Sequence, residues 1–223
     1  MSLIRPFAGL RPAAGHAADV AAPPYDVLNS SEARVRVEGP PLSFLHISKP
    51  EIDLPEGTDP FDASVYAKGK ENFDNMVNEG VLTQDEKASY YLYRLIMGDH
   101  QQIGLVAGAS VPDYDTNRIR KHEFTRPEKE DDRVRQVDTL NAQTGPVFLT
   151  YRHNATIDAL VERVTAAAPE VDITADDGVQ HAINTKTHQH STFKGFNMDI
   201  AGPVFQRLRN QGVHQSNDWG IIF

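Results

Sequence analysis

Apolar positions along this chain fall into short segments with two different periods. Two pairs of strand-like segments each flank a glycine-containing turn, which is typical of β-hairpins. The pairs are 90–97 with 103–111 around Gly98-Asp99-His100, and 171–174 with 179–183 around Asp176-Asp177-Gly178. Further strands are predicted over 42–48 and 146–151, where short apolar runs end near proline or polar residues.

Helical spacing of apolar residues appears in two other places. Asp59-Pro60 is typical of an N-cap followed by proline in the first turn, and the apolar spacing that follows ends at Gly80. Asn154 is predicted to cap a helix that ends before Pro169. Hairpins mixed with helices favour an α+β fold, with a mixed or antiparallel sheet packed by several helices, over a doubly wound parallel sheet.

The composition changes near Ile183. The chain carries a net charge of −9, yet residues 183–223 carry +2 and residues 1–182 therefore carry −11. The last segment is also rich in Asn and Gln and has little periodicity. We predict an α+β domain over 1–182 and a divergent tail over 183–223 that is poorly ordered in part.

Composition excludes several classes of site. The chain of 223 residues has no cysteine, which excludes disulfides, thiolate nucleophiles and cysteine-bound zinc. It has no apolar run of membrane-spanning length and no apolar segment of signal-peptide type at its start, so we expect a cytoplasmic protein without a membrane partner. The net charge of −9 argues against broad binding to nucleic acid, but a local site for one phosphate ester stays open.

The densest group of charged residues lies between Arg118 and Arg135. Thr125 and Glu128 fit a capping box, and a helix that starts at Thr125 would direct its free N–H groups and positive dipole end towards the preceding loop. That loop contains Lys121, His122 and Glu123, which have the chemistry of an anion site.

In this hypothesis Lys121 and Arg126 bind phosphate, while His122 or Glu123 moves a proton. Arg126 and Arg133 share one face of the predicted helix with Glu130 and are further ligand candidates. The alternative is a solvated helix face held by charge pairs at three- and four-residue spacing. Both interpretations stay open at this point.

Other candidate sites contain fewer residues suited to ligand binding or catalysis. Pro23-Pro24 would present Tyr25 and Asp26 rigidly to a ligand, although a stiff turn with a capping aspartate explains the same residues. His46 and Lys49 lie at the end of the strand predicted over 42–48 and are weaker candidates. His188-Gln189-His190 lacks a nearby carboxylate, so we predict no metal site. The common phosphate-loop, dinucleotide and hydrolase motifs do not occur.

Five separated motifs, in order, resemble domain-of-unknown-function family 1015 over about residues 3–182. They are Ile4-Arg5-Pro6-Phe7, Pro23-Pro24-Tyr25-Asp26-Val27, Lys121-His122-Glu123-Phe124-Thr125, Lys129-Glu130-Asp131-Asp132-Arg133 and Pro146-Val147-Phe148. The resemblance is to the N-terminal half of family members, which are linked to SerK, a free-serine kinase with a ParB-like fold.

The resemblance implies a bacterial-type cytoplasmic phosphotransferase that takes ADP or ATP with Mg²⁺ and a small hydroxyl compound. Family members also carry an Asp-Gly-His-His-Arg motif, and Asp177-Gly178-Val179-Gln180-His181 does not match it. We therefore expect a truncated or frame-shifted C-terminal half and impaired activity. The alternative is a non-catalytic module that binds an anionic metabolite or a partner protein, and homo-oligomer formation stays open.

Overall fold

The structure, a computed structural model, describes residues 3–39, 41–121, 126–187, 198–199 and 219–222. The chain forms two compact units. The first unit contains residues 1–9, 85–134 and 145–223, and the second contains residues 10–84 and 135–144. Each unit is therefore assembled from segments that are distant in the sequence.

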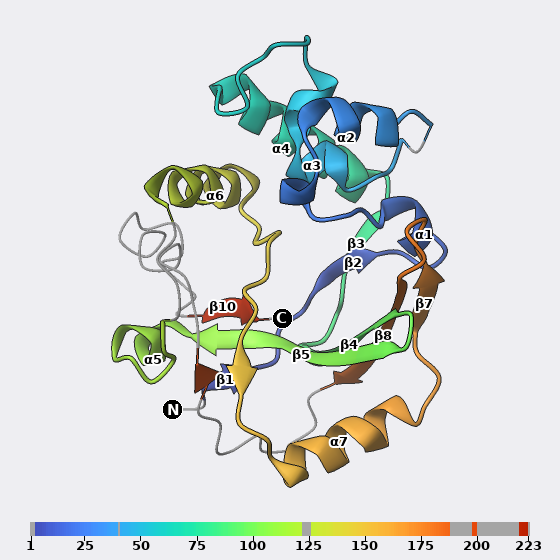
Figure 1. The fold of residues 1–223 in the computed structure, drawn as a ribbon, viewed down its shortest axis with the longest axis vertical. Coiled ribbons are helices and arrows are strands. Elements are labelled where there is room, and N and C mark those ends of the chain that lie inside the picture. Colours follow the sequence, from blue (N-terminus) through green and yellow to red (C-terminus); the bar gives the residue numbers. More distant parts are fainter. Residues whose placement is uncertain (1–2, 40, 122–125, 188–197, 200–218, 223) are drawn as a thin grey trace. The chain divides into compact units, whose positions relative to one another are not determined.

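An antiparallel sheet forms the centre of the first unit, with strand order β1-β5-β4-β8-β7 and with β10 also paired to β5 (Figure 1). The strands are β1 (Ile4–Arg5), β4 (Ser89–Met97), β5 (His100–Ser110), β7 (Val171–Thr174), β8 (Gln180–Thr187) and β10 (Trp219–Ile222). The predicted α+β class with an antiparallel sheet is confirmed.

Both predicted hairpins are present in this sheet. Strands β4 and β5 pair from Met97 opposite His100, and β7 and β8 pair from Thr174 opposite Gln180. Gly98 and Gly178 in the two turns have φ values of 57° and 81°, a backbone conformation that glycine adopts without steric cost. Each glycine therefore explains why the chain reverses where the sequence predicted it.

The helices of the first unit include α5 (Val111–Asp115), α7 (Ala155–Thr165) and the first part of α6 (Pro127–Leu140). Asn154 caps α7 as predicted, since its side chain accepts hydrogen bonds from the backbone N–H groups of Thr156 and Ile157. The strand predicted over 146–151 is shorter, because only β6 (Thr150–Tyr151) is regular; it pairs with β9 (Met198–Asp199).

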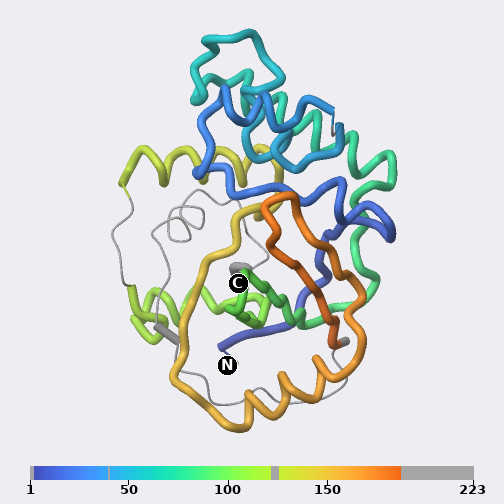
Figure 2. Tube along the Cα trace, turned by 45° about the vertical axis from the view of Figure 1, so that its right-hand side comes forward, coloured from blue at the N-terminus to red at the C-terminus, as the bar shows by residue number. Residues whose placement is uncertain are grey.

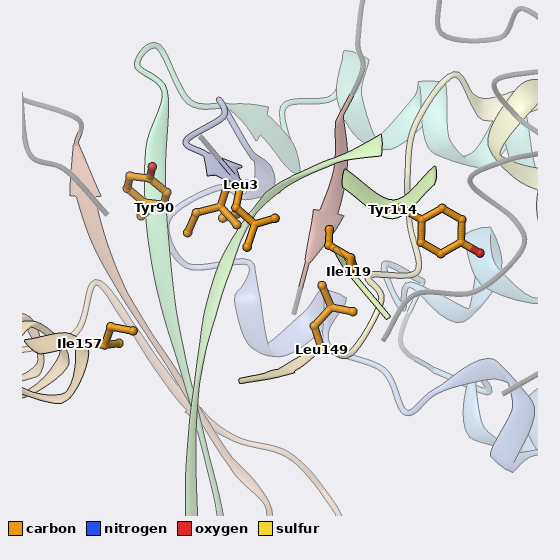
Figure 3. Close-up of a cluster of buried hydrophobic side chains, with 8 residues drawn as sticks. Leu3, Tyr90, Tyr114, Ile119, Leu149 and Ile157 are labelled. Atoms are coloured by element: carbon orange, nitrogen blue, oxygen red, sulfur yellow. The ribbon is translucent and has the colours of Figure 1, made fainter. Parts of the chain in front are cut away.

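The core of the first unit lies between the sheet, α5 and α7 (Figure 3). Its buried members are Leu3, Ile4, Tyr90, Ala107, Tyr114, Ile119, Leu149 and Ile157. Ile157 joins α7 to this cluster, and the Asn184 side chain of β8 donates to the Ala167 carbonyl just beyond α7. Ile119, at the start of the charged segment, is thus packed into this core.

The second unit is mostly helical (Figure 2). It contains α1 (Ala17–Val20), η1 (Tyr25–Val27), α2 (Ser30–Arg36), α3 (Leu45–Ser48), η2 (Pro50–Asp53), α4 (Ala63–Asn78), the end of α6, and the strand pair β2 (Leu10–Pro12) and β3 (Leu82–Gln84). Apolar side chains from α3, α4 and α6, including Ile47, Met76 and Leu140, form its larger core.

The strand predicted over 42–48 is wrong, because its second half forms α3. Leu45 and Ile47 are both fully buried, but they belong to different apolar clusters. A helical turn sends the two side chains in these directions, whereas residues two apart on a strand would point to the same face. A short apolar run cannot distinguish these cases from its spacing alone.

Helix α4 also begins later than predicted. Asp62 is the N-cap and accepts a hydrogen bond from Ser64 N at 2.8 Å, while Asp59 caps the preceding turn through Phe61 N. The predicted end is confirmed, since Gly80 follows the helix with a φ of 74°. The predicted start at Asp59-Pro60 was therefore wrong by one turn.

Strand β8 continues through Ile183, where the composition changes. Of the tail beyond Thr187, the structure describes only β9 and β10, so most of the prediction about its order concerns residues outside the described ranges. Among the described residues, no helix is both long and apolar enough to cross a membrane.

Candidate functional site

The loop after α5 carries the first residues of the predicted anion site. Lys121 is exposed, and its Nζ lies 4.5 Å from the ring centroid of Tyr114 in α5. The predicted proton-transfer residues His122 and Glu123 lie outside the described residues, as does Thr125, the predicted capping residue.

Helix α6 begins one residue later than predicted. The carbonyl of Arg126 accepts hydrogen bonds from Lys129 N at 3.0 Å and Glu130 N at 3.1 Å, which places Arg126 at the N-cap position. The Arg126 side chain is exposed. Glu128 and Glu130 lie in the first turn, where their negative charges complement the helix dipole. Because these carboxylates repel an anion, binding of an anion at this helix start requires positive charge from the nearby cations.

Tyr114 in α5 contacts the start of the charged segment. Its side chain is 2% exposed, and it contacts Lys121 through the cation–π interaction. Burial raises the pKa of the Tyr114 phenol, and the nearby carboxylate of Glu130 raises it further. Lys121 is therefore in direct contact with the Tyr114 ring, and the charge of Glu130 in the first turn of α6 acts on the phenol electrostatically. The anion site itself stays a prediction.

Two other arginines of the segment, Arg118 and Arg133, are paired with carboxylates. Arg133 donates from Nε and Nη2 to Oδ2 of the buried Asp132, at 3.1 and 2.7 Å. Arg118 donates from Nη1 to Asp113 Oδ1 at 3.0 Å. Within the described part of the chain, Lys121 and Arg126 form no ion pair of this kind. Both are exposed, so they are candidates to bind an external anion.

Tyr25 and Asp26 belong to the second unit and form η1 directly after Pro24. Tyr25 is half-buried and Asp26 is exposed. The residue that caps the next helix is Asn29, which forms a capping box with Glu32, so Asp26 does not have this role. Asp26 thus presents an exposed carboxylate on a turn that Pro24 restricts.

A network in the second unit surrounds His46, which sequence reasoning ranked low. Its Nδ1 donates to the carboxylate of Asp53 at 2.9 Å, and Asn72 Nδ2 donates to Asp53 Oδ2 at 2.7 Å and to the His46 carbonyl at 2.8 Å. Burial alone would raise the pKa of Asp53, but these hydrogen bonds and the positive charges of His46 and Lys68 lower it.

A second network lies at Glu51, which is 4% exposed. Its Oε1 accepts hydrogen bonds from Ser30 Oγ at 2.8 Å and Lys49 Nζ at 3.0 Å. The guanidinium of Arg34 donates to the carbonyls of Glu51, Ile52 and Leu54. These contacts satisfy buried polar groups and fix η2 against α2. The contacts of Ser30 and Arg34 have no local sequence signal, because the bonded residues are 17 to 21 positions apart.

One further pair of titratable side chains lies on the sheet of the first unit. The Tyr93 hydroxyl donates to His181 Nδ1 across β4 and β8, and the two rings stack with centroids 5.9 Å apart. Burial raises the pKa of Tyr93 to about 12 and lowers the pKa of His181, although Asp177 partly offsets the latter. The neutral forms of both groups are therefore favoured near neutral pH.

The comparisons with known proteins identify one family. The family model described as "Protein of unknown function (DUF1015)" matches residues 4–194, which extends beyond the point at which the composition changes. No curated protein matches the chain, and no solved structure does. The match covers most of the chain and includes the charged segment and the Pro23–Asp26 turn.

Proposed function

For a chain that belongs to the DUF1015 family of proteins of unknown function, we propose a role as the N-terminal part of a SerK-like small-molecule phosphotransferase. The observation that supports this proposal is the exposed Lys121, held over the ring of the buried Tyr114, in the same charged segment as Arg126 at the N-cap of α6. In the sequence, His122 and Glu123 lie between this cation and the start of α6.

Phosphoryl transfer makes few covalent demands on a protein, since catalysis depends mainly on positioning and on stabilising the charge of the transferred group. Lys121 and Arg126 supply this positive charge in the proposal. They are exposed, and within the described residues they are not neutralised by carboxylates as Arg118 and Arg133 are.

In the proposed step, the hydroxyl oxygen of a small acceptor attacks the terminal phosphorus of ADP or ATP. The bond from this phosphorus to the bridging oxygen breaks, and AMP or ADP leaves with the electron pair. Glu123 or His122 accepts the hydroxyl proton. Serine is the first acceptor to test, because the resemblance to SerK suggests it.

A reaction of this type takes Mg²⁺, which shields the charge of nucleotide phosphates. Among the described residues, no group of three or more His, Asp or Glu side chains is placed to hold a metal ion. In the proposal the nucleotide phosphates would therefore be the main ligands of Mg²⁺.

The absence of an Asp-Gly-His-His-Arg motif from the sequence leads us to expect impaired activity. The second candidate is therefore a non-catalytic module that binds an anionic metabolite through the same two cations. Binding to DNA, which a ParB-like relationship suggests, is disfavoured by the net charge of −9.

A phosphotransfer assay separates these functions. The chain is incubated with ADP or ATP, Mg²⁺ and serine, and phosphoserine is measured by ³¹P NMR for the wild type, Glu123→Gln and Arg126→Ala. An enzyme forms product and loses this activity in Glu123→Gln. A binding module forms no product, retains nucleotide affinity in Glu123→Gln and loses it in Arg126→Ala. Failure of all three proteins to bind or convert nucleotide would contradict both functions.

A further inference from the structure

The hydroxyl of Tyr114 has an unusual position for a buried tyrosine. The side chain is 2% exposed, and its oxygen is buried with no hydrogen-bond partner among the described residues. In Figure 3 the hydroxyl points away from Ile119 and Leu149, the core residues drawn nearest to the ring. The ring therefore belongs to the apolar core, whereas its polar end leaves that core.

A buried hydroxyl without a partner is costly, since the group has lost its bonds to water and gained none in return. Tyr91, a buried tyrosine of the neighbouring sheet, avoids this cost. The Tyr91 hydroxyl accepts from Gly9 N at 2.7 Å and donates to Asp85 Oδ2 at 2.6 Å. A phenylalanine at position 114 would fill the same core volume without the unsatisfied oxygen.

The charges around Tyr114 indicate the chemistry of a missing partner. Lys121 lies over the ring, and Arg126 is at the N-terminus of α6, one turn before Glu130. Two exposed cations, a helix N-terminus and a hydroxyl donor together suit an anionic oxygen. The negative charge of Glu130 also acts on the Tyr114 phenol. A ligand must therefore offer strong acceptor oxygens to offset the repulsion from this carboxylate.

We propose that Tyr114 is a positioning residue whose hydroxyl donates a hydrogen bond to a phosphate oxygen bound between Lys121 and the start of α6. This inference rests on the anion site of the proposed function, but it requires neither a nucleotide nor turnover. In this role the cation–π contact holds Lys121 beside the same oxygen, so that the charge and the hydroxyl act on one group.

The test uses inorganic phosphate as the probe and the full chain with Tyr114→Phe. Phosphate binding is followed by ³¹P NMR titration, and the melting temperature is measured without phosphate. Tyr114→Phe is expected to weaken phosphate binding about tenfold or more, the loss of one hydrogen bond to a charged acceptor. Its melting temperature should be unchanged or higher, because the variant removes an unsatisfied buried oxygen.

Tyr91→Phe is the matched control, since its hydroxyl is already satisfied within the chain. This variant should lose thermal stability and bind phosphate as the wild type does. Equal phosphate affinity of wild type and Tyr114→Phe would overturn the proposal. So would the absence of saturable phosphate binding by the wild type, or a fall in melting temperature of Tyr114→Phe as large as that of the control. Phosphate binding without any phosphotransfer would contradict only the proposed enzyme activity.

Discussion

Gly69 lies where α4 approaches η2 too closely for any side chain. A Cβ atom at this position would lie 2.7 Å from Pro50 Cγ and 3.4 Å from the Ile47 carbonyl oxygen. The first distance is well below van der Waals contact, and Pro50 is a buried, rigid ring that cannot rotate away. Gly69→Ala therefore forces a shift of η2 or of the helix.

The expected change has two opposing contributions. Alanine is favoured over glycine in a helix by about 1 kcal/mol. Overpacking a filled contact costs about 1–3 kcal/mol, and the rigidity of Pro50 places this site towards the upper end. We predict that Gly69→Ala lowers the free energy of unfolding by about 1–2 kcal/mol, opposite in sign to the effect of helix propensity alone.

The assay is urea unfolding followed by far-UV circular dichroism. Asn75→Ala is the control, because Asn75 is exposed on the same helix and its replacement should raise stability by a few tenths of a kcal/mol through propensity. If Gly69→Ala were also more stable than the wild type, the described contact between α4 and η2 would be wrong.

Three further predictions concern polar groups that stabilise each unit from within. Because the pKa of Asp53 is lowered in the folded protein, its carboxylate stabilises the fold above the unfolded-state pKa of about 3.9. This stabilisation is lost as the pH falls through the folded-state pKa. Asp53→Asn should therefore reduce the pH dependence of the free energy of unfolding, measured by denaturant titration from about pH 3 to 6. Arg34→Met should cost about 2–4 kcal/mol, because three carbonyls of the η2 segment lose a charged donor; a loss below 0.5 kcal/mol in urea unfolding would refute this role. Asn154→Ala should cost about 1 kcal/mol by the same method, and an unchanged value would show that α7 does not depend on this cap.

The parts of the fold that could be predicted from the sequence are those with a local cause. Both hairpins follow from a turn glycine between strand-like segments, and the start of α7 follows from Asn154. The errors arose where tertiary contacts decide the outcome. Residues 45–48 form a helix because Leu45 and Ile47 must reach two different cores, which their spacing does not reveal.

The candidate site was predictable only in its residue types. The sequence placed Lys121 and Arg126 near a helix start, but it could not show that Lys121 lies over the ring of Tyr114. The sequence pattern does not distinguish Tyr114 from an ordinary core residue. Its unsatisfied hydroxyl is a property of packing, so no spacing rule would have selected it.

The central claim is that Arg126 and its neighbours form an anion site. Calorimetric titration of the full chain with ADP and with ATP, each with Mg²⁺, tests this claim directly in wild type, Arg126→Ala and Arg163→Ala. Arg163 is an exposed arginine on α7 of the first unit and serves as the control. The proposal predicts saturable binding that Arg126→Ala weakens and Arg163→Ala leaves unchanged. No heat at millimolar nucleotide, or equal losses in the two variants, would contradict it.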